Sequence, residues 1–277
     1  MNSWLGNTKR KFIYLIDIAI NLRQYLRVLR GYRNIKKEKI FWEFPMYFFS
    51  KDMGIKNTAL IIAHHYGFIG NTLFDNSMNR ELKYEISLWC CESVHSKIKL
   101  SSSLSMNEGM LELIFNYNSV DIYIYGITIA PGYLFGLSCQ SVILISRMQA
   151  VSGDSTLLQK CTKEQIGINP QRNLFYACMG IAEKLNITHL VSVKASNQVS
   201  SVNRRLSVFT YDKFLETFGV NKCDNEYYYF ELSMLQNNKS CNLTSHKRRH
   251  LIRHKFNTNI KQSIVINLDK VICGDRI

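Results

Sequence analysis

The sequence predicts an α+β fold with a mostly antiparallel sheet and one helix–strand crossover. Short segments that alternate apolar and polar residues follow one another from about residue 82 to 150, as antiparallel strands joined by tight turns do. An amphipathic helical pattern then spans residues 169–185, and the apolar segment 188–193 follows it directly. A strand, a helix and a second buried strand imply a crossover packed over the sheet, and this layout also admits an N-acetyltransferase-like fold.

The chain has enough apolar material for a packed core. Of its 277 residues, 46% are hydrophobic and 12% are aromatic, so global disorder is not expected. We predict a basic amphipathic helix with a connector in residues 1–54 and a single α+β domain in residues 55–277. No apolar run reaches the roughly 18 residues of a membrane-spanning helix, so the sequence predicts no such span.

The N-terminal residues predict a basic helix. From about residue 8 to 32 the leucines and isoleucines recur at helical spacing, while Arg23, Arg27 and Arg30 line another face. Such a helix can lie on an anionic membrane, or it can pack its leucines on its own domain and leave the arginines in water. The segment around Pro45 is expected to connect it to a short helix over residues 57–67.

The middle of the chain predicts five strands. Segments 82–90 and 96–104 alternate, which places Cys90 on the apolar side with Leu88. Segments 107–118 and 119–130 meet at Asn118-Ser119, a turn-like pair. Residues 137–151 are apolar enough to form a central strand.

The crossover has clear helix boundaries. Ser155 can cap a helix that ends near Gln165, and Asn169 is a good N-cap for a second helix with Pro170 in its first turn. Asn186 can take the left-handed conformation after that helix. Its apolar stripe is Leu174, Phe175, Cys178, Ile181, Ala182 and Leu185. A helix over residues 210–219, a strand over 226–232 and a basic terminal helix over 245–256 complete the prediction.

The positive charge is concentrated at the two ends of the chain. The formal net charge is +14, residues 1–39 contribute +8 and residues 239–261 contribute +7, so the rest sums to −1. Basic ends favour anionic partners such as phospholipid headgroups, lipopolysaccharide phosphates or RNA, although they can also be solvated faces. The predicted basic surface consists of Arg23, Arg27, Arg30, Lys247, Arg248, Arg249 and Arg253.

The eight cysteines include no C-x-x-C pair, which favours reduced thiols over disulfides or a zinc site. We therefore expect a cytoplasmic protein, or one held at the inner membrane. A periplasmic location is disfavoured because Asp17 interrupts the apolar start and no cleavage site follows. His246, His250 and His254 share one helical face, but basic neighbours surround them, so no metal site is predicted.

The sharpest enzymatic motifs are absent from the sequence. It contains no G-x-x-x-x-G-K-[ST], G-x-S-x-G, H-E-x-x-H or G-x-G-x-x-G. The best candidate for a pocket is the start of the 170 helix with the end of the 188–193 strand, because a helix N-terminus favours an anion and strand ends favour ligands. The alternative is that these residues only cap and turn the chain. The candidate residues are Asn169, Gln171, Arg172, Ser192, Lys194, Ser196, Asn197, Arg204 and Arg205.

The C-terminal half resembles the VirK/YbjX family of bacterial proteins. The residues that carry the likeness are NPQRNLFYACMGIAEKLNITHLVSVKASNQV (169–199), NRRLSVFTYDKFLETFG (203–219), FEL (230–232) and SHKRRHLIRHKF (245–256). Weaker similarity extends back to about residue 55. The chain departs from the family at Met148-Gln149-Ala150, where Leu-Gln-Gly is common, and at Gln198, where histidine is frequent.

The resemblance implies a virulence-associated protein of Gram-negative bacteria. Its expected role is an accessory one, in the post-transcriptional expression or surface localisation of an outer-membrane virulence factor of the VirG/IcsA autotransporter type. The expected partner is that surface protein or its transcript, together with an anionic membrane surface, and no cofactor is expected.

The second hypothesis is an acyl-CoA-dependent N-acyltransferase-like enzyme that acts on an envelope component and is linked to antimicrobial-peptide resistance. The stretch from Ser141 to Val193 follows the order of strand, loop, helix N-terminus and strand that holds a pyrophosphate in such enzymes. Gln165, Gly167 and Arg172 resemble part of the phosphate loop.

Overall fold

The computed structural model describes residues 49–72, 85–102, 108–151, 155–199, 205–220, 222–237 and 247–273. The predicted helix over residues 8–32 and the connector at Pro45 lie outside these residues. The strands are β1 (Ile86–Cys91), β2 (Ser96–Ser102), β3 (Leu111–Tyr117), β4 (Val120–Pro131), β5 (Ser141–Ala150), β6 (His189–Val193), β7 (Lys222–Cys223) and β8 (Tyr227–Glu231). The main helices are α3 (Ile55–Thr72), α4 (Ser155–Glu164), α5 (Pro170–Lys184), α6 (Arg205–Glu216), α7 (Leu232–Asn237) and α8 (Lys247–Cys273).

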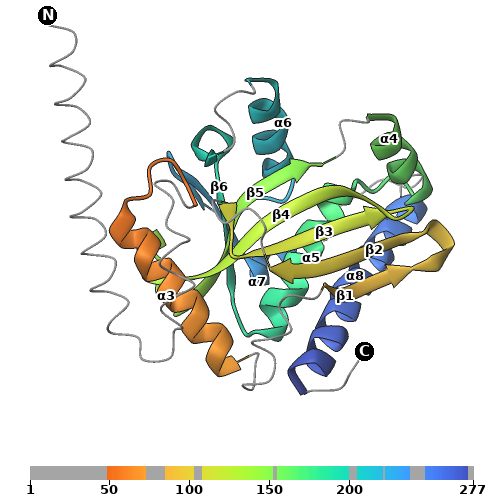
Figure 1. Cartoon of the computed structure of the whole chain (residues 1–277). Helices are drawn as coiled ribbons and strands as arrows, with labels where there is room; N and C mark the ends of the chain where they lie inside the picture. The colour runs from red at the N-terminus through yellow and green to blue at the C-terminus, as the bar shows by residue number, and fades with distance from the viewer. Residues whose placement is uncertain are drawn as a thin grey trace, which may run out of the picture.

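The strands form one sheet in the order β1-β2-β3-β4-β5-β6-β8-β7, and Figure 1 shows the antiparallel strands β1 to β5 side by side. Strands β1 to β5 pair antiparallel with their sequence neighbours, whereas β5 and β6 pair in parallel and β8 pairs antiparallel with both β6 and β7. The predicted α+β class, the mostly antiparallel sheet and the single crossover are therefore confirmed.

Tight turns and one bulge set the register of the first strands. Asn118 and Ser119 have φ of 49° and 65°, as a two-residue hairpin turn requires. A bulge between Ser87 and Trp89 makes Leu88 and Trp89 both buried and turns Cys90 outward. The expectation that Cys90 shares the apolar side with Leu88 was wrong, because one extra residue reverses the alternation.

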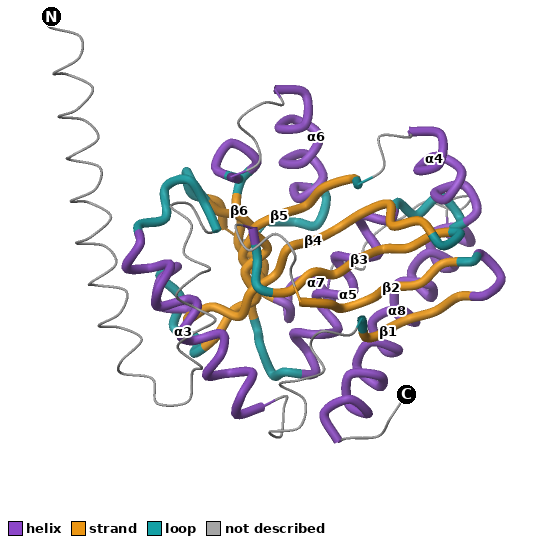
Figure 2. Tube along the Cα trace, in the orientation of Figure 1, coloured by secondary structure: helices purple, strands orange, loops and turns teal. Residues whose placement is uncertain are grey.

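Helices cover both faces of the sheet. Helices α5 and α8 lie behind it and α3 lies in front of it in Figures 1 and 2. The larger core, between the sheet and α5, contains buried aromatic side chains such as Phe115, Phe175 and Phe230. The smaller core packs α3 against the middle of the sheet, with Ile61 facing the side of the sheet that carries Leu144. Because both faces of β5 are buried, its near-continuous apolar sequence is explained.

The crossover helix begins and ends as predicted. The Asn169 side chain accepts a hydrogen bond from the backbone N–H of Gln171 at 2.9 Å, and Pro170 is the first helical residue. The predicted stripe is buried along its whole length, from Leu174 to Leu185. Asn186 adopts a φ of 55°, so the left-handed helix end is confirmed as well.

Helix α8 packs along α5 and is longer than the predicted 245–256 segment. A Cβ added at Gly180 would lie 2.9 Å from the Ile264 side chain, so the two helices approach closely there. Lys261 pairs with Glu183, and Lys184 pairs with Asp269. Both helices therefore run side by side in the same direction. Helix α6 also differs from its prediction, since it begins at residue 205 rather than 210.

Candidate functional site

The end of β6 is tied to α6 by one buried tyrosine. The Tyr211 hydroxyl lies 2.9 Å from Ser192 Oγ and donates to the carbonyl of Val193 at 2.9 Å. Gln198 also hydrogen-bonds to Tyr211. Ser192, Tyr211 and Gln198 are all buried, and burial raises the pKa of Tyr211 far above its usual value.

The start of α5 is tied to the sheet by a second buried tyrosine. Tyr125, in β4, donates a hydrogen bond from its hydroxyl to the carbonyl of Gln171 at 2.7 Å. Tyr125 is fully buried, which raises the pKa of its hydroxyl. The buried hydroxyls of Tyr125 and Tyr211 therefore bond to protein groups rather than to solvent, whereas the buried Oδ1 of Asn173, near the start of α5, has no hydrogen-bond partner among the described residues.

The backbone N–H groups of the α4–α5 loop donate hydrogen bonds within the same segment. The Gln171 N–H is bound by the Asn169 cap, and other N–H groups of the loop and first helical turn donate to carbonyls within the same segment. The donors are those of Gln165, Gly167, Ile168, Gln171, Arg172 and Asn173. A phosphate at this helix start would have to replace those acceptors.

The charged candidates lie on aromatic rings. The Arg172 guanidinium sits 4.7 Å from the Phe218 ring centroid and donates to Thr217 Oγ1 at 3.0 Å. The Lys194 ammonium lies 5.3 Å from the Tyr228 ring centroid. Both stack at the edge of the α5–β6 junction, where a cation on an aromatic face is stabilised.

The remaining candidates divide between surface and undescribed positions. Ser196 is exposed and Asn197 half-buried, in the short turn after β6. Arg205 is the first residue of α6, and Arg204 lies outside the described residues. Asn169, Gln171 and Arg172 form the start of α5, whereas Ser192 contacts Tyr211 on α6.

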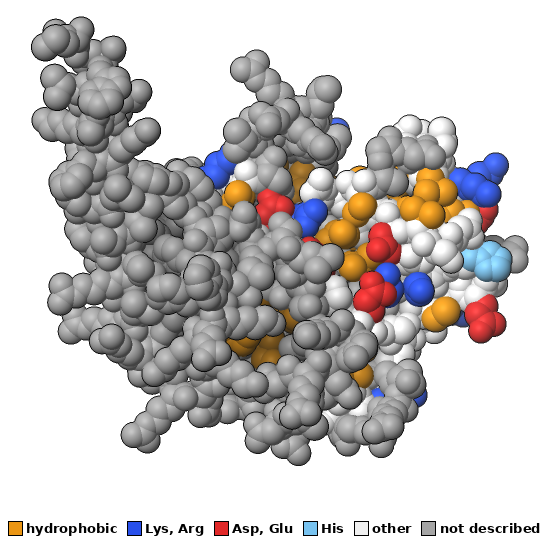
Figure 3. All heavy atoms as spheres, in the orientation of Figure 1, with side chains coloured by type: hydrophobic (Ala, Val, Ile, Leu, Met, Phe, Trp, Pro, Cys, Tyr) orange, Lys and Arg blue, Asp and Glu red, His pale blue; other side chains and the backbone are white. Residues whose placement is uncertain are grey.

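A charged network on the strand face was missed from the sequence. Lys99 contacts Glu85 at 2.9 Å and Asp121 at 3.2 Å, and Arg147 contacts Glu108 at 3.2 Å and Glu112 at 3.3 Å. Basic and acidic side chains lie side by side on this face in Figure 3. The partners of Lys99 and Arg147 lie on other strands or in the segments beside them, so only the sheet order brings these charges together.

The pKa of Lys99 reflects this network. Burial alone would lower it, but hydrogen bonds to Glu85 and Asp121 and their negative charge raise it. The lysine therefore stays charged, and it joins an acid just before β1 to an acid on β4.

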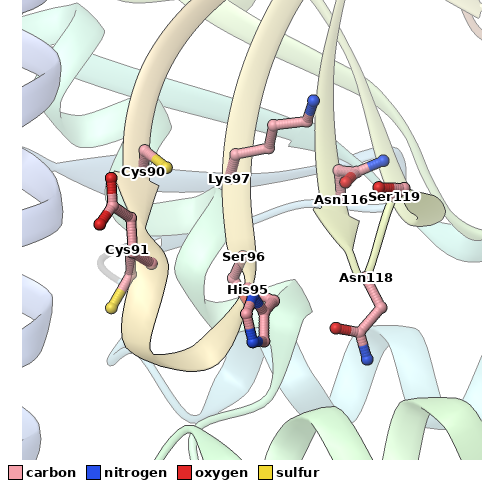
Figure 4. Close-up of a pocket in the computed structure, with 9 residues that line it drawn as sticks. Cys90, Cys91, His95, Ser96, Lys97, Asn116, Asn118 and Ser119 are labelled. Atoms are coloured by element: carbon pink, nitrogen blue, oxygen red, sulfur yellow. The ribbon is translucent and has the colours of Figure 1, made fainter.

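An open hollow lies where the β1–β2 and β3–β4 hairpins turn. Figure 4 shows Cys90, Lys97 and Asn116 in a row on three neighbouring strands, with His95 and Asn118 at the hairpin tips. The lining residues are Cys90, Cys91, Glu92, His95, Ser96, Lys97, Asn116, Asn118 and Ser119. The hollow is wide and shallow, so it can contact a macromolecule more readily than enclose a small ligand.

Helix α3 brings two histidines to the sheet. His64 Nε2 lies 2.9 Å from Ser141 Oγ, and His65 Nδ1 accepts a hydrogen bond from the Ile129 N–H at 3.1 Å. Burial lowers the pKa of His64, and it lowers the pKa of His65 to about 3. Among the described residues no carboxylate bonds to the His64 ring, so the Ser141–His64 pair lacks the third group of a hydrolase triad.

Several classes of feature are not found in the described part of the chain. No helix there is both long and apolar enough to cross a bilayer. No group of three or more His, Cys, Asp or Glu residues could hold a metal ion. The cysteines at positions 90, 91, 139, 161, 178 and 223 are free.

The predicted C-terminal basic residues lie at the start of α8. Lys247, Arg248 and Arg249 occupy its first turn. The Arg253 Nε–H donates to the carbonyl of Ile166 at 3.0 Å, which ties α8 to the α4–α5 loop. Arg23, Arg27, Arg30 and His246 lie outside the described residues.

The fold and the site define an α+β protein with a packed α5–β6 junction and a charged strand face. The chain belongs to a family of proteins of unknown function (DUF535), whose profile matches residues 6–263. No curated protein and no solved structure matches the chain. The match covers both sides of residue 54 without a break. It therefore does not test the division into residues 1–54 and 55–277, which stays a prediction.

Proposed function

We propose that this protein is a non-catalytic accessory factor of the VirK/YbjX type, which supports the post-transcriptional expression or surface localisation of an outer-membrane virulence protein. The observation that carries the proposal is the family match over residues 6–263, since DUF535 is the family to which VirK and YbjX proteins belong. The buried hydroxyls of Tyr125 and Tyr211 support it, because they bond to backbone carbonyls and so act in the fold rather than as reactive groups.

The proposed partner is the surface protein or its transcript, and the proposed place of action is the cytoplasm or the inner face of the inner membrane. The proposed binding surfaces for such a partner are the charged strand face and the hollow between the hairpins. Both are wide and polar, as transient protein contacts are.

Deleting the gene tests the proposal through three quantities: the transcript, the total amount and the surface amount of the virulence protein. We expect an unchanged transcript with either a reduced total amount, which indicates expression, or a reduced surface fraction, which indicates localisation. If all three stay unchanged, the proposal fails. Affinity capture with the full chain, with and without ribonuclease, then separates a protein partner from an RNA partner.

A second candidate is the acyl-CoA-dependent enzyme, because one observation favours it. Strands β5 and β6 pair in parallel only over Ile143–Ile145, whereas β5 continues to Ala150. Strand β6 ends at Val193, so the rest of β5 runs on without β6 beside it, as the expected acyl-CoA layout requires. The internally bonded N–H groups of the α4–α5 loop weigh against it.

Arg172→Ala separates the two candidates. If the α5 N-terminus binds the phosphates of acetyl-CoA, titration calorimetry should show binding heat for the wild type and a loss of that heat for the variant. Under the accessory proposal the wild type gives no heat, and Arg172→Ala restores surface display as well as the wild type does.

A further inference from the structure

Apolar side chains are exposed where α8 passes the α4–α5 loop. Leu251 is 53% exposed, Ile252 is 40% exposed and Ile166, in the loop, is 40% exposed. The hydrogen bond from Arg253 to the Ile166 carbonyl fixes the loop beside this part of the helix. The start of α8 lies next to the end of α4 in Figures 1 and 2. We call residues Lys163, Ile166, Leu251, Ile252, Arg253 and Lys255 the α8–loop surface.

Ile166 is held outward in a strained conformation. Its φ is 60°, in the left-handed region, and Gly167 follows with a φ of 73°. A β-branched residue rarely adopts this region, because its Cβ crowds the backbone, whereas asparagine or glycine does so easily. The strain is not compensated by full burial of the side chain. An apolar side chain kept outward at such a position points to a contact outside the chain.

The charge around these side chains is mostly positive, and the acid beside Ile166, Glu164, accepts a hydrogen bond from the Tyr117 hydroxyl at 2.7 Å. Residues 247–255 hold five lysines and arginines and no acid, and Lys255 and Lys163 are exposed. Farther along α8 the charges are paired within the protein, by Lys261 with Glu183 and by Asp269 with Lys184. The unbalanced charge and the exposed Leu251 and Ile252 thus coincide in the first half of the helix.

This combination matches the surface of an anionic bilayer. Interfacial helices place aliphatic side chains among the acyl chains and lysines or arginines among the phosphates. Single-stranded RNA would instead require exposed aromatic side chains for stacking. The phenylalanine of α8, Phe256, packs edge-on against Trp89, with ring centroids 5.7 Å apart.

We infer that the α8–loop surface docks on membranes rich in anionic phospholipid. Leu251, Ile252 and Ile166 enter the headgroup region, and the basic residues contact lipid phosphates. The inference rests on α8 and the loop alone, so it stands whether or not the proposed accessory function is correct.

Vesicle sedimentation with the full chain tests it. We expect binding to equimolar phosphatidylcholine–phosphatidylglycerol vesicles and little to pure phosphatidylcholine vesicles. Changing Leu251 and Ile252 together to serine should weaken binding about tenfold or more, and Lys255→Glu about fivefold or more. Ile266→Ser is the matched control, because Ile266 is 57% exposed on the same helix but outside the α8–loop surface. It should bind like the wild type.

Ile166→Asn separates docking from folding. Asparagine tolerates the left-handed φ, so the melting temperature should rise, while vesicle binding should fall because the apolar side chain is gone. A general loss of folding would lower both. The inference is overturned if the Leu251/Ile252 double variant binds like the wild type, or if Ile266→Ser loses as much as it does. It is also overturned if the chain does not sediment with the anionic vesicles but binds single-stranded RNA in an anisotropy titration.

Discussion

The Tyr211 hydroxyl bridges α6 to the end of β6, where it lies 2.9 Å from Ser192 Oγ and donates to the Val193 carbonyl. The sequence analysis named Ser192 as a pocket candidate, and Tyr211 lies in segment 203–219, which carries part of the family resemblance. Their contact shows why Ser192 is polar inside a buried strand: it is a hydrogen-bond partner for a buried phenol.

Tyr211→Phe should therefore lower the free energy of unfolding by about 1–3 kcal/mol, because it leaves Ser192 and Val193 with an unfilled hydrogen bond in the core. Urea denaturation measures the change. Tyr133→Phe is the control, since the Tyr133 side chain is 62% exposed and its replacement should change stability little. Equal losses in the two variants would contradict the structural role of Tyr211.

Asn169→Ala removes the cap of α5. The lost acceptor for the Gln171 N–H should cost about 1 kcal/mol of folding free energy, whereas Asn169→Asp keeps an acceptor and adds a favourable charge at the helix N-terminus. Thermal melting of both variants checks this order. If alanine and aspartate destabilise equally, the cap is not the reason for asparagine at this position.

Gly180→Ala tests the contact between α5 and α8. Helix propensity alone would make alanine more stable by about 1 kcal/mol. The new Cβ, however, would lie 2.9 Å from both the Ile264 side chain and the Lys261 carbonyl, and such overpacking costs about 1–3 kcal/mol. We expect net destabilisation by urea denaturation. Gly54→Ala has no atom within 4 Å of its Cβ and should be close to neutral.

Local signals predicted the elements well, and long-range pairing could not be read from the sequence. Asn169, Pro170 and Asn186 mark helix boundaries through their own backbone chemistry, so these predictions were confirmed. Alternation located the strands but failed at Cys90, because a bulge depends on the pairing of β1 with β2 and not on β1 alone.

The candidate site shows the same limit. The sequence indicated which residues end β6 and begin α5, and the structure confirms Asn169 as the cap of α5. The positions of Tyr125 and Tyr211 could not be predicted from the sequence, because the elements that carry them are distant along the chain from the groups that they contact. The Lys99 and Arg147 networks were missed for the same reason, since their acidic partners lie on other strands or loops.

His65 should make folding sensitive to acid. Its ring is 2% exposed, and burial lowers its pKa from 6.5 to about 3, with a smaller contribution from the charge of His64. Above about pH 6.5 the imidazole is neutral in both the folded and unfolded states, so it adds no pH dependence. Below that value the unfolded state binds a proton that the folded state does not, so stability falls as pH falls until the folded state also protonates.

Between about pH 7 and pH 5 this difference amounts to roughly 2 kcal/mol for a single group. His65→Asn is the matched variant, because the Asn side-chain oxygen can replace Nδ1 as the acceptor for the Ile129 N–H but cannot titrate. Urea denaturation of both proteins across this range should show a steeper loss of stability for the wild type, by about that amount. Parallel pH profiles would mean that His65 is accessible to protons in the folded state, which contradicts its burial between α3 and β4.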